Sequence, residues 1–424
     1  MSKSIERFDM VVVGGGLAGL AAGATATAAG ATAVVLERHL PGGRARTTKR
    51  DGFLLNEGAH AFYVGGPGMA VLRSLGVHVD GSPPPLRRYQ LQAGSRLHRF
   101  PAGPVSLLRT SAVGARGRAQ LLRLLADLPR LRPERLRGQS VRDWLAGMGL
   151  RADADALVRA LLRLTTYVGD LDAMSADVAA AQLDTGGRHG VLYLHGGWSQ
   201  LVDALARHVD VRPQTAAHVI EAAPGGVAVH TDGATYLAGA VVVAAGTPAA
   251  ARVLLPDAPA WDLAEPVTVA CLDVGARRAP TLGYVLSLDT PVYGTTQAPP
   301  ARQAPPGGAV VAVVRYGVRG PDEDRAELGA HLRVLGIQPE DEITSRFLPR
   351  MVVAGALPLA ASGGLAGRPG VTASGLRDVY MAGDWVGPSG WLADASLASG
   401  RAAAVAALSR MRRSRLGDLV GSGT

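Results

Sequence analysis

The first forty residues alternate between short apolar runs and glycine-rich turns. Residues 10–13 are apolar and mostly β-branched, which is typical of a strand buried on both faces. The alanine-rich stretch from Leu17 predicts a helix that ends near Gly30, and residues 32–36 predict a second strand. No charge occurs between Met10 and Leu36, a span long enough to cross a bilayer. Its glycines divide it into shorter elements, so the pattern favours a strand–helix–strand unit over a membrane span.

The turn between this strand and this helix carries a phosphate-binding pattern. Gly14, Gly16 and Gly19 form G-x-G-x-x-G. The first glycine permits the turn, the second lets the backbone approach a pyrophosphate, and the third lets the helix pack closely on the strand. Leu17 and Ala18 open the helix, whose free N–H groups and positive dipole end suit phosphate. We therefore predict a dinucleotide-binding α/β domain of the Rossmann type.

An acid follows the second predicted strand. Glu37 stands 23 residues after Gly14, where a carboxylate accepts hydrogen bonds from ribose hydroxyls, and Arg38 lies next to it. The acid favours a cofactor with a free 2′-hydroxyl. The pattern to this point does not separate NAD from FAD.

The next stretch separates them through a resemblance. Gly42, Gly43, Arg44 and Thr47 form G-G-R-x-x-T, in which Arg44 offers a forked, permanently charged donor to the pyrophosphate. On these residues the chain resembles the flavin-dependent amine oxidase and phytoene desaturase superfamily. The loop between Glu37 and Gly42 is one residue shorter than that pattern, and Leu40 stands where a basic residue is usual.

The resemblance implies bound FAD and extends to further segments. Gly58, Ala59 and His60 match the loop that passes the flavin ring. Near the C-terminus, residues 379–382 would form a strand beside the first strand–helix–strand unit, and Gly383 and Asp384 would contact the ribityl or phosphate part of FAD. Asp394, Ala395 and Ser396 would open the last helix beneath the pyrimidine end of the flavin, where a positive helix end eases reduction.

The middle of the chain adds a substrate domain. By resemblance, the backbone of Val219 would face the adenine, and Asp232-Gly233 would turn a hairpin before a buried strand at 241–245. We expect a discontinuous FAD-binding domain of residues 1–75, 190–255 and 345–424. The interleaved α+β substrate domain would comprise residues 76–189 and 256–344, with a hairpin at 89–100 and β-rich runs at 266–275, 281–289 and 308–317.

Composition narrows the possible partners and compartments. The formal charge is +9, and lysine occurs only at positions 3 and 49, so arginine supplies 42 of the 44 basic residues. Aromatic residues are only 4% of the chain and no nucleic-acid motif occurs, which argues against nucleic-acid binding. No signal peptide is evident, which predicts a cytoplasmic protein. The arginine-bearing helices at 116–150 suit either a solvated face or peripheral contact with a membrane.

The single cysteine, Cys271, rules out a disulfide framework and a cysteine metal cluster. It also lies far from the superfamily's flavin attachment region, which favours non-covalent FAD. We expect no metal. Because no lysine follows position 49, the active-site lysine of many amine oxidases is missing.

Three functions fit the pattern. The first is an FAD-dependent dehydrogenase or desaturase that transfers a hydride from a C–H of a largely apolar small molecule to flavin N5. The second is an amine oxidase that uses O2, and quinone is the other expected electron acceptor. The third is a redox-neutral flavin isomerase, or a binding protein similar to the Rab GDP-dissociation inhibitors. His60, Tyr193, His195 and Trp391 are the candidates for the catalytic cavity.

Overall fold

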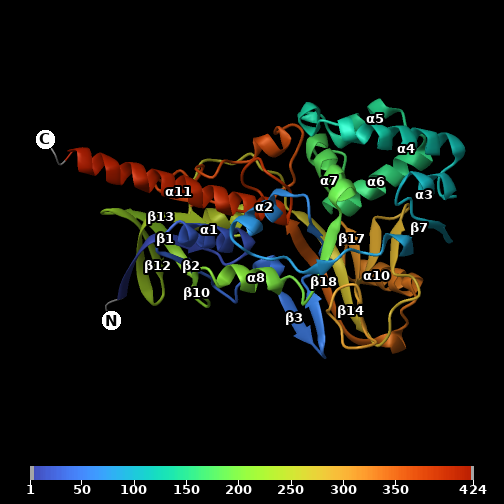
Figure 1. Ribbon diagram of the computed structural model, residues 1–424, viewed down its shortest axis with the longest axis horizontal. Helices are drawn as coiled ribbons and strands as arrows, with labels where there is room; N and C mark the ends of the chain where they lie inside the picture. Colours follow the sequence, from blue (N-terminus) through green and yellow to red (C-terminus); the bar gives the residue numbers. More distant parts are fainter. Residues whose placement is uncertain (1–3, 422–424) are drawn as a thin grey trace.

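The computed structural model describes residues 4–421, with side chains described as far as residue 413. Two seven-stranded sheets organise this part of the chain. Figure 1 shows one sheet and its helices at the end of the molecule that carries both termini, and the other sheet at the opposite end. This arrangement confirms the predicted α/β fold with a second, mixed region.

The first sheet is built around the predicted strand–helix–strand unit. Its order is β10-β2-β1-β13-β12-β11, with β19 also paired to β13. The strands are β1 (Ser4–Val13), β2 (Ala33–Leu36), β10 (Asp210–Arg212), β11 (Ala217–Ala223), β12 (Gly226–Thr231), β13 (Ala234–Val243) and β19 (Val379–Met381). β1 runs parallel to β2 and β13, and β12 and β13 form the predicted hairpin around residues 232–233. The four buried residues at the end of β1 explain its uninterrupted apolar run.

The C-terminal strand lies one position further from β1 than the sequence suggested. β19 pairs in parallel with β13, Val241 opposite Val379, so β13 separates it from the first strand–helix–strand unit. The carboxyl ends of β1, β13 and β19 nevertheless lie at one edge of the sheet, which is where α/β sheets bind ligands.

Two helices pack face to face beside this sheet. α1 (Leu17–Ala28) lies against the long α11 (Ala393–Gly421), as Figure 1 shows. A Cβ atom at Gly400 would lie 2.1 Å from the carbonyl oxygen of Ala18. The glycine at this position therefore permits the close approach of the two helices. Gly19 does the same within the turn, since a Cβ there would lie 1.8 Å from the carbonyl oxygen of Gly14.

The second sheet has the order β18-β14-β17-β16-β15-β7-β8. Its strands are β7 (Tyr89–Ala93), β8 (Arg96–Arg99), β14 (Val267–Ala276), β15 (Tyr284–Ser287), β16 (Val292–Ala298), β17 (Ala309–Tyr316) and β18 (Glu342–Ala354). Successive side chains of β14 point to opposite faces of this sheet. On one face, Ala270, Leu272 and Val274 pack in a core with α10 (Pro321–Leu335). On the other face, Val269 and Cys271 pack in the core formed with the helices between residues 104 and 189.

The β18 strand belongs to this second sheet, where it pairs with β14. The boundary that we placed at residue 345 therefore falls inside a strand of the substrate-domain sheet. Another small sheet, β5-β9-β6, joins residues on both sides of the boundary at 76. These pairings tie the two regions together around the site described below.

The remaining elements complete the framework. The short strands are β3 (Thr47–Arg50), β4 (Phe53–Asn56), β5 (Phe62–Tyr63), β6 (Gly81–Ser82) and β9 (Val191–Leu194). The remaining helices are α2 (Pro67–Ser74), α3 (Pro104–Arg109), α4 (Ala115–Asp127), α5 (Val141–Met148), α6 (Ala152–Thr166), α7 (Ala176–His189), α8 (Ser199–Ala206) and α9 (Pro248–Leu254). Among residues 4–421, none of the helices combines the length and the apolar character that a membrane crossing requires.

The close contact of α1 and α11 makes a direct stability prediction. We expect Gly400→Ala to destabilise the protein by about 1–3 kcal/mol, because the added methyl group overlaps the Ala18 carbonyl. Gly187→Ala, in α7, is the matched control: no atom lies within 4 Å of its added Cβ, so the change should stabilise by up to about 1 kcal/mol. Denaturant unfolding of both variants checks this. Equal stabilities would contradict the proposed contact.

Candidate functional site

A cavity of about 540 Å³ opens where the two sheets meet. It is lined by the glycine turn, the end of β2, the segment around Arg44, the loop before β5, the ends of β13 and β18, and the start of α11. Its volume lies within the range of small-molecule sites. The segments at both ends of the sequence thus contribute to one site, as the resemblance implied.

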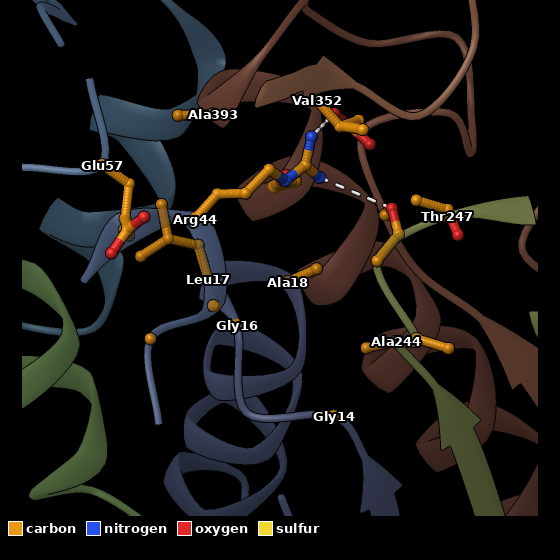
Figure 2. Close-up of a pocket in the computed structure, with 18 of the residues that line it drawn as sticks. Gly14, Gly16, Leu17, Ala18, Arg44, Glu57, Ala244, Thr247, Val352 and Ala393 are labelled. Carbon is orange, nitrogen blue, oxygen red and sulfur yellow. Dashed lines mark hydrogen bonds and ion pairs between the residues drawn. The ribbon is translucent and has the colours of Figure 1, made fainter. Parts of the chain in front are cut away.

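The glycine turn forms one end of the cavity. Gly14 and Gly16 line it together with Leu17 and Ala18, at the start of α1 (Figure 2). Gly14 has φ +109°, in the region that favours glycine, and a Cβ there would lie 2.3 Å from the Ala244 carbonyl oxygen. A Cβ at Gly16 would meet no atom within 4 Å, so its backbone faces open space. This is the bare backbone that a diphosphate needs.

Glu37 and Arg38 line the same end of the cavity. One carboxylate oxygen of Glu37 accepts the Gly15 N–H at 2.7 Å, and the other accepts the His39 N–H at 2.8 Å. These bonds fix the carboxylate beside the glycine turn. It has the position and the remaining acceptor capacity that a ribose diol requires.

Arg44 crosses the cavity and joins three distant segments. Its Nη1 donates to Asp384 Oδ2 at 2.7 Å and to the Val353 carbonyl at 3.1 Å. Figure 2 shows the side chain extending from its loop beside the glycine turn toward Val352 and Thr247. We expected Arg44 to serve the pyrophosphate; the structure places it in the cavity lining, with its guanidinium paired to Asp384.

Asp384 is buried, at 1% exposed, and lines the cavity with Gly383. Its Oδ2 also accepts the Gly355 N–H at 3.2 Å, whereas its Oδ1 has no hydrogen-bond partner among the described residues. A buried carboxylate oxygen without a partner is costly, so a ligand hydroxyl that donates to it would be stabilising. A sugar-alcohol chain such as the ribityl group of a flavin fits this requirement.

The loop after β4 forms a wall at the other end of the cavity. Gly58 has φ +88° and lies behind the wall, close to Met351, while Ala59 and His60 line the cavity. The His60 Nδ1–H donates to the Gly58 carbonyl at 3.0 Å. Burial lowers the pKa of His60 below its ordinary value, so the ring is neutral at physiological pH.

Three aromatic side chains complete this end, which we call the aromatic end: Tyr63, Tyr167 and Trp391. Each directs its polar atom to a backbone carbonyl. Tyr63 donates to Thr165 at 2.9 Å, Tyr167 to Ala59 at 3.0 Å, and the Trp391 indole N–H to Thr166 at 2.9 Å. Ring surfaces therefore remain for a ligand.

The N-terminus of α11 adds a carboxyl group to the wall. Asp394 and Ser396 line the cavity, whereas Ala395 is fully buried behind them. Asp394 Oδ1 accepts the N–H of Gly68, in the first turn of α2, at 2.8 Å. Burial raises the pKa of Asp394 to about 7, against the smaller opposite effect of this hydrogen bond. No ion pair is described for Asp394, unlike Glu57 and Asp384.

Six of the predicted site residues do not line the cavity: Gly19, Gly58, Tyr193, His195, Val219 and Ala395. Tyr193 is buried in a group of tyrosines, with its hydroxyl 2.8 Å from Thr295 Oγ1. His195 contacts Ser82 and accepts the Arg302 N–H at 3.1 Å. Tyr193 lies in β9, the central strand of the small β5-β9-β6 sheet, and His195 follows this strand. Of the four catalytic candidates, only His60 and Trp391 line the cavity.

Val219 also lies away from the cavity. It sits within β11 and is 48% exposed. The residues that line the cavity are 215–217, at the start of this strand. Residues 215–217, rather than Val219, would therefore border the adenine, which is two to four residues earlier in the chain than we expected.

Two further lining segments contain none of the predicted site residues. Residues 244–247 follow β13, and the Ala244 N–H donates to the Val13 carbonyl at 2.8 Å, which places them beside the glycine turn. The rule that carboxyl ends of parallel strands share an edge could have found them. Residues 351–353 come from β18, and no motif marks them. Within residues 4–421, no group of three or more His, Cys, Asp or Glu side chains could hold a metal ion.

Comparison with known proteins agrees with this site. A model of the flavin-containing amine oxidoreductase family matches residues 17–408, and the chain therefore belongs to that family. Because it belongs to this family, the protein is a flavin-dependent oxidoreductase. No curated protein sequence gives a significant match.

Solved structures share the fold at low sequence identity. An oxidoreductase from Methanosarcina mazei is 18% identical, with a TM-score of 0.71 over 93% of this chain and 99% of that one. A redesigned triple mutant of putrescine oxidase is 16% identical, with a TM-score of 0.72 over 96% and 100%. Cyclohexylamine oxidase from Brevibacterium oxydans IH-35A is 17% identical, with a TM-score of 0.68 over 96% and 99%.

The buried carboxyl of Asp394 predicts a pH dependence of stability. The pKa of Asp394 is raised in the folded protein. The contribution of this carboxyl to the free energy of unfolding is therefore fully present below about pH 4 and is lost as the pH rises toward about 7. From pH 5 to pH 7.5, we expect the wild type to lose roughly 2 kcal/mol more unfolding free energy than Asp394→Asn. Asparagine retains an acceptor for Gly68 but has no charge. Parallel pH profiles of the two proteins in denaturant titrations would contradict the prediction.

Proposed function

We propose that the protein binds FAD non-covalently and uses it to remove a hydride from a C–H of a largely apolar small molecule, as a dehydrogenase or desaturase. The electron acceptor would be a quinone or O2. FAD, when bound, supplies the hydride acceptor at its flavin N5. The protein's own residues bind the cofactor, orient the substrate and exclude water.

The proposal rests mainly on the aromatic end of the cavity. The polar atoms of Tyr63, Tyr167, Trp391 and His60 all donate to backbone carbonyls. Burial of Tyr167 also keeps its pKa well above the ordinary value, so it offers no base. These walls present ring surface and few free polar groups, which favours an apolar substrate held by shape.

FAD rather than a shorter flavin is supported by the length of the site. The cavity extends from the backbone at Gly16 and the carboxylate of Glu37 to Asp384 and the start of α11. Glu37 suits a ribose, the backbone at Gly16 a diphosphate, Asp384 a ribityl chain and the start of α11 a flavin ring. Non-covalent binding is supported by Cys271, which is buried outside the cavity lining with its thiol 3.4 Å from Asp273.

An amine oxidase is the second candidate, and Asp394 favours it. This cavity carboxyl has no described cationic partner, and a substrate ammonium group could pair with it. Two of the structural neighbours are named as amine oxidases. An amine bound there would lower the pKa of Asp394 by adding a positive charge.

A spectroscopic experiment tests the proposed function. We expect the purified protein to show the visible bands of FAD, and acid precipitation to release that FAD into solution. Without air, an apolar substrate of the right class should bleach the flavin bands in a single turnover. Peroxide release with amines in air would instead support the second candidate. A colourless protein that does not take up added FAD would contradict both.

Gly16→Val is the variant that links this result to the cavity. Gly16 has φ −77° and open space around the position of a Cβ, so valine is compatible with the fold. Its side chain would occupy the diphosphate position. We expect FAD affinity to fall at least about 100-fold, while denaturant unfolding of the FAD-free protein is unchanged. Gly187→Ala, at an exposed position outside the cavity lining, should retain full FAD content.

A further inference from the structure

The positive charge of the chain is concentrated in one segment. Residues 86–137 contain twelve arginines and two acids, Asp127 and Glu134, and so carry a net charge of +10. The whole chain carries +9, so the other residues together carry a net charge of −1. The excess of positive charge therefore belongs to this segment and is not spread evenly along the chain.

These arginines are available to a partner. Eleven of the twelve are exposed, and Arg118 is half-buried. The ion pair described for this segment, Arg123 with Asp127, has a separation of 4.0 Å and both side chains in solvent. Such a pair adds little stability, so the positive field of the segment is not neutralised by its own acids.

Hydrogen bonds join the elements of the segment into one surface. Thr110 Oγ1, after α3, donates to the Arg99 carbonyl on β8 at 2.8 Å, and His98 lies 2.8 Å from Ser111 Oγ. Arg118, on α4, donates to the Leu108 carbonyl at 2.7 Å. Figure 1 places α3, α4 and β7 together at the end of the molecule opposite the C-terminus. We call the exposed face of β8, α3 and the start of α4 the arginine surface.

Apolar side chains project from the middle of the arginine surface. Val105 and Leu108 are 63% and 56% exposed on α3, three residues apart and therefore on one side of this short helix. Leu107 faces inward and anchors the helix, at 2% exposed. Leu97 on β8 is also exposed. Arg99 and Arg109 flank these apolar groups in the chain.

We propose that the arginine surface docks the protein on a bilayer that contains anionic lipids. The arginines would bind lipid phosphates, and Val105 and Leu108 would enter the interface between headgroups and acyl chains. A nucleic acid is the other large polyanion, but it is disfavoured because its bases stack on exposed rings. The aromatic residues of the segment are Tyr89 and Phe100, which are buried and half-buried.

Vesicle co-sedimentation of the full-length protein tests the proposal. We expect binding to phosphatidylcholine vesicles that contain phosphatidylglycerol, weak binding to phosphatidylcholine alone, and loss of binding as salt is raised from about 0.15 M to about 1 M. Absence of binding to the anionic vesicles at about 0.15 M salt would overturn the proposal. So would tighter binding of the protein to single-stranded DNA than to the anionic vesicles.

Matched variants locate the contact. The test variant replaces Arg96, Arg99, Arg109 and Arg116 with Gln, and the control variant replaces with Gln the residues Arg73, Arg207, Arg277 and Arg333, which are exposed elsewhere. Both lose the same charge. We expect the test variant to bind anionic vesicles at least about tenfold more weakly and the control to change less than about threefold. Equal losses would overturn the proposal.

A second pair of changes separates docking from charge attraction. Val105→Ser with Leu108→Ser keeps every arginine and alters two exposed positions, so the fold should be unaffected. We expect vesicle affinity to fall at least about fivefold, because the apolar groups that would enter the interface are lost. Unchanged affinity would overturn the insertion of α3. The flavin spectrum of each variant should equal that of the wild type, which makes this test independent of the proposed redox function.

Discussion

The buried carboxylate of Asp384 is the constraint around which the cavity is organised. It lies near the C-terminus, yet it is neutralised by Arg44 at 2.7 Å and bound by the Gly355 N–H at 3.2 Å. A carboxylate that is 1% exposed needs such partners. Arg44 in turn holds the Val353 carbonyl on β18. One ion pair thus joins the first domain segment, the returning C-terminal segment and the sheet of the second region.

The two ends of the cavity are built on opposite principles. At the glycine turn, backbone groups and helix N-termini are left bare, which suits a charged, polar ligand. At the aromatic end, Tyr63, Tyr167 and Trp391 have their polar atoms bonded to backbone carbonyls and leave ring surface free. A dinucleotide can thus be held firmly at one end while a less polar molecule is placed at the other. Asp394 is the exception, since it brings a titratable group to the aromatic end.

The sequence predicted the features that depend on short local patterns, but not those that depend on contacts between distant segments. The glycine turn, Glu37 and the segments around Arg44 and Asp384 could be predicted because short spacing rules dictate them, and all of these line the cavity. Tyr63 and Tyr167 could not, because contacts between β5, α6 and the Gly58 loop decide where their rings lie. Tyr193 and His195 were misplaced because the side of a strand that faces a site depends on its pairing. The boundary expected at residue 345 divides β18, because the sequence of this strand does not reveal that it pairs with β14.

The coupling of Arg44 and Asp384 is the most direct measure of this account. A double-mutant cycle with Arg44→Met, Asp384→Asn and the double variant would be followed by denaturant unfolding and by FAD titration. Each single change leaves one member of the pair without its partner, so the two single losses of unfolding free energy should sum to more than the loss in the double variant. We predict a coupling free energy of at least about 1 kcal/mol in unfolding, with weakened FAD binding in all three variants. Strictly additive effects, with FAD affinity unchanged, would contradict the account.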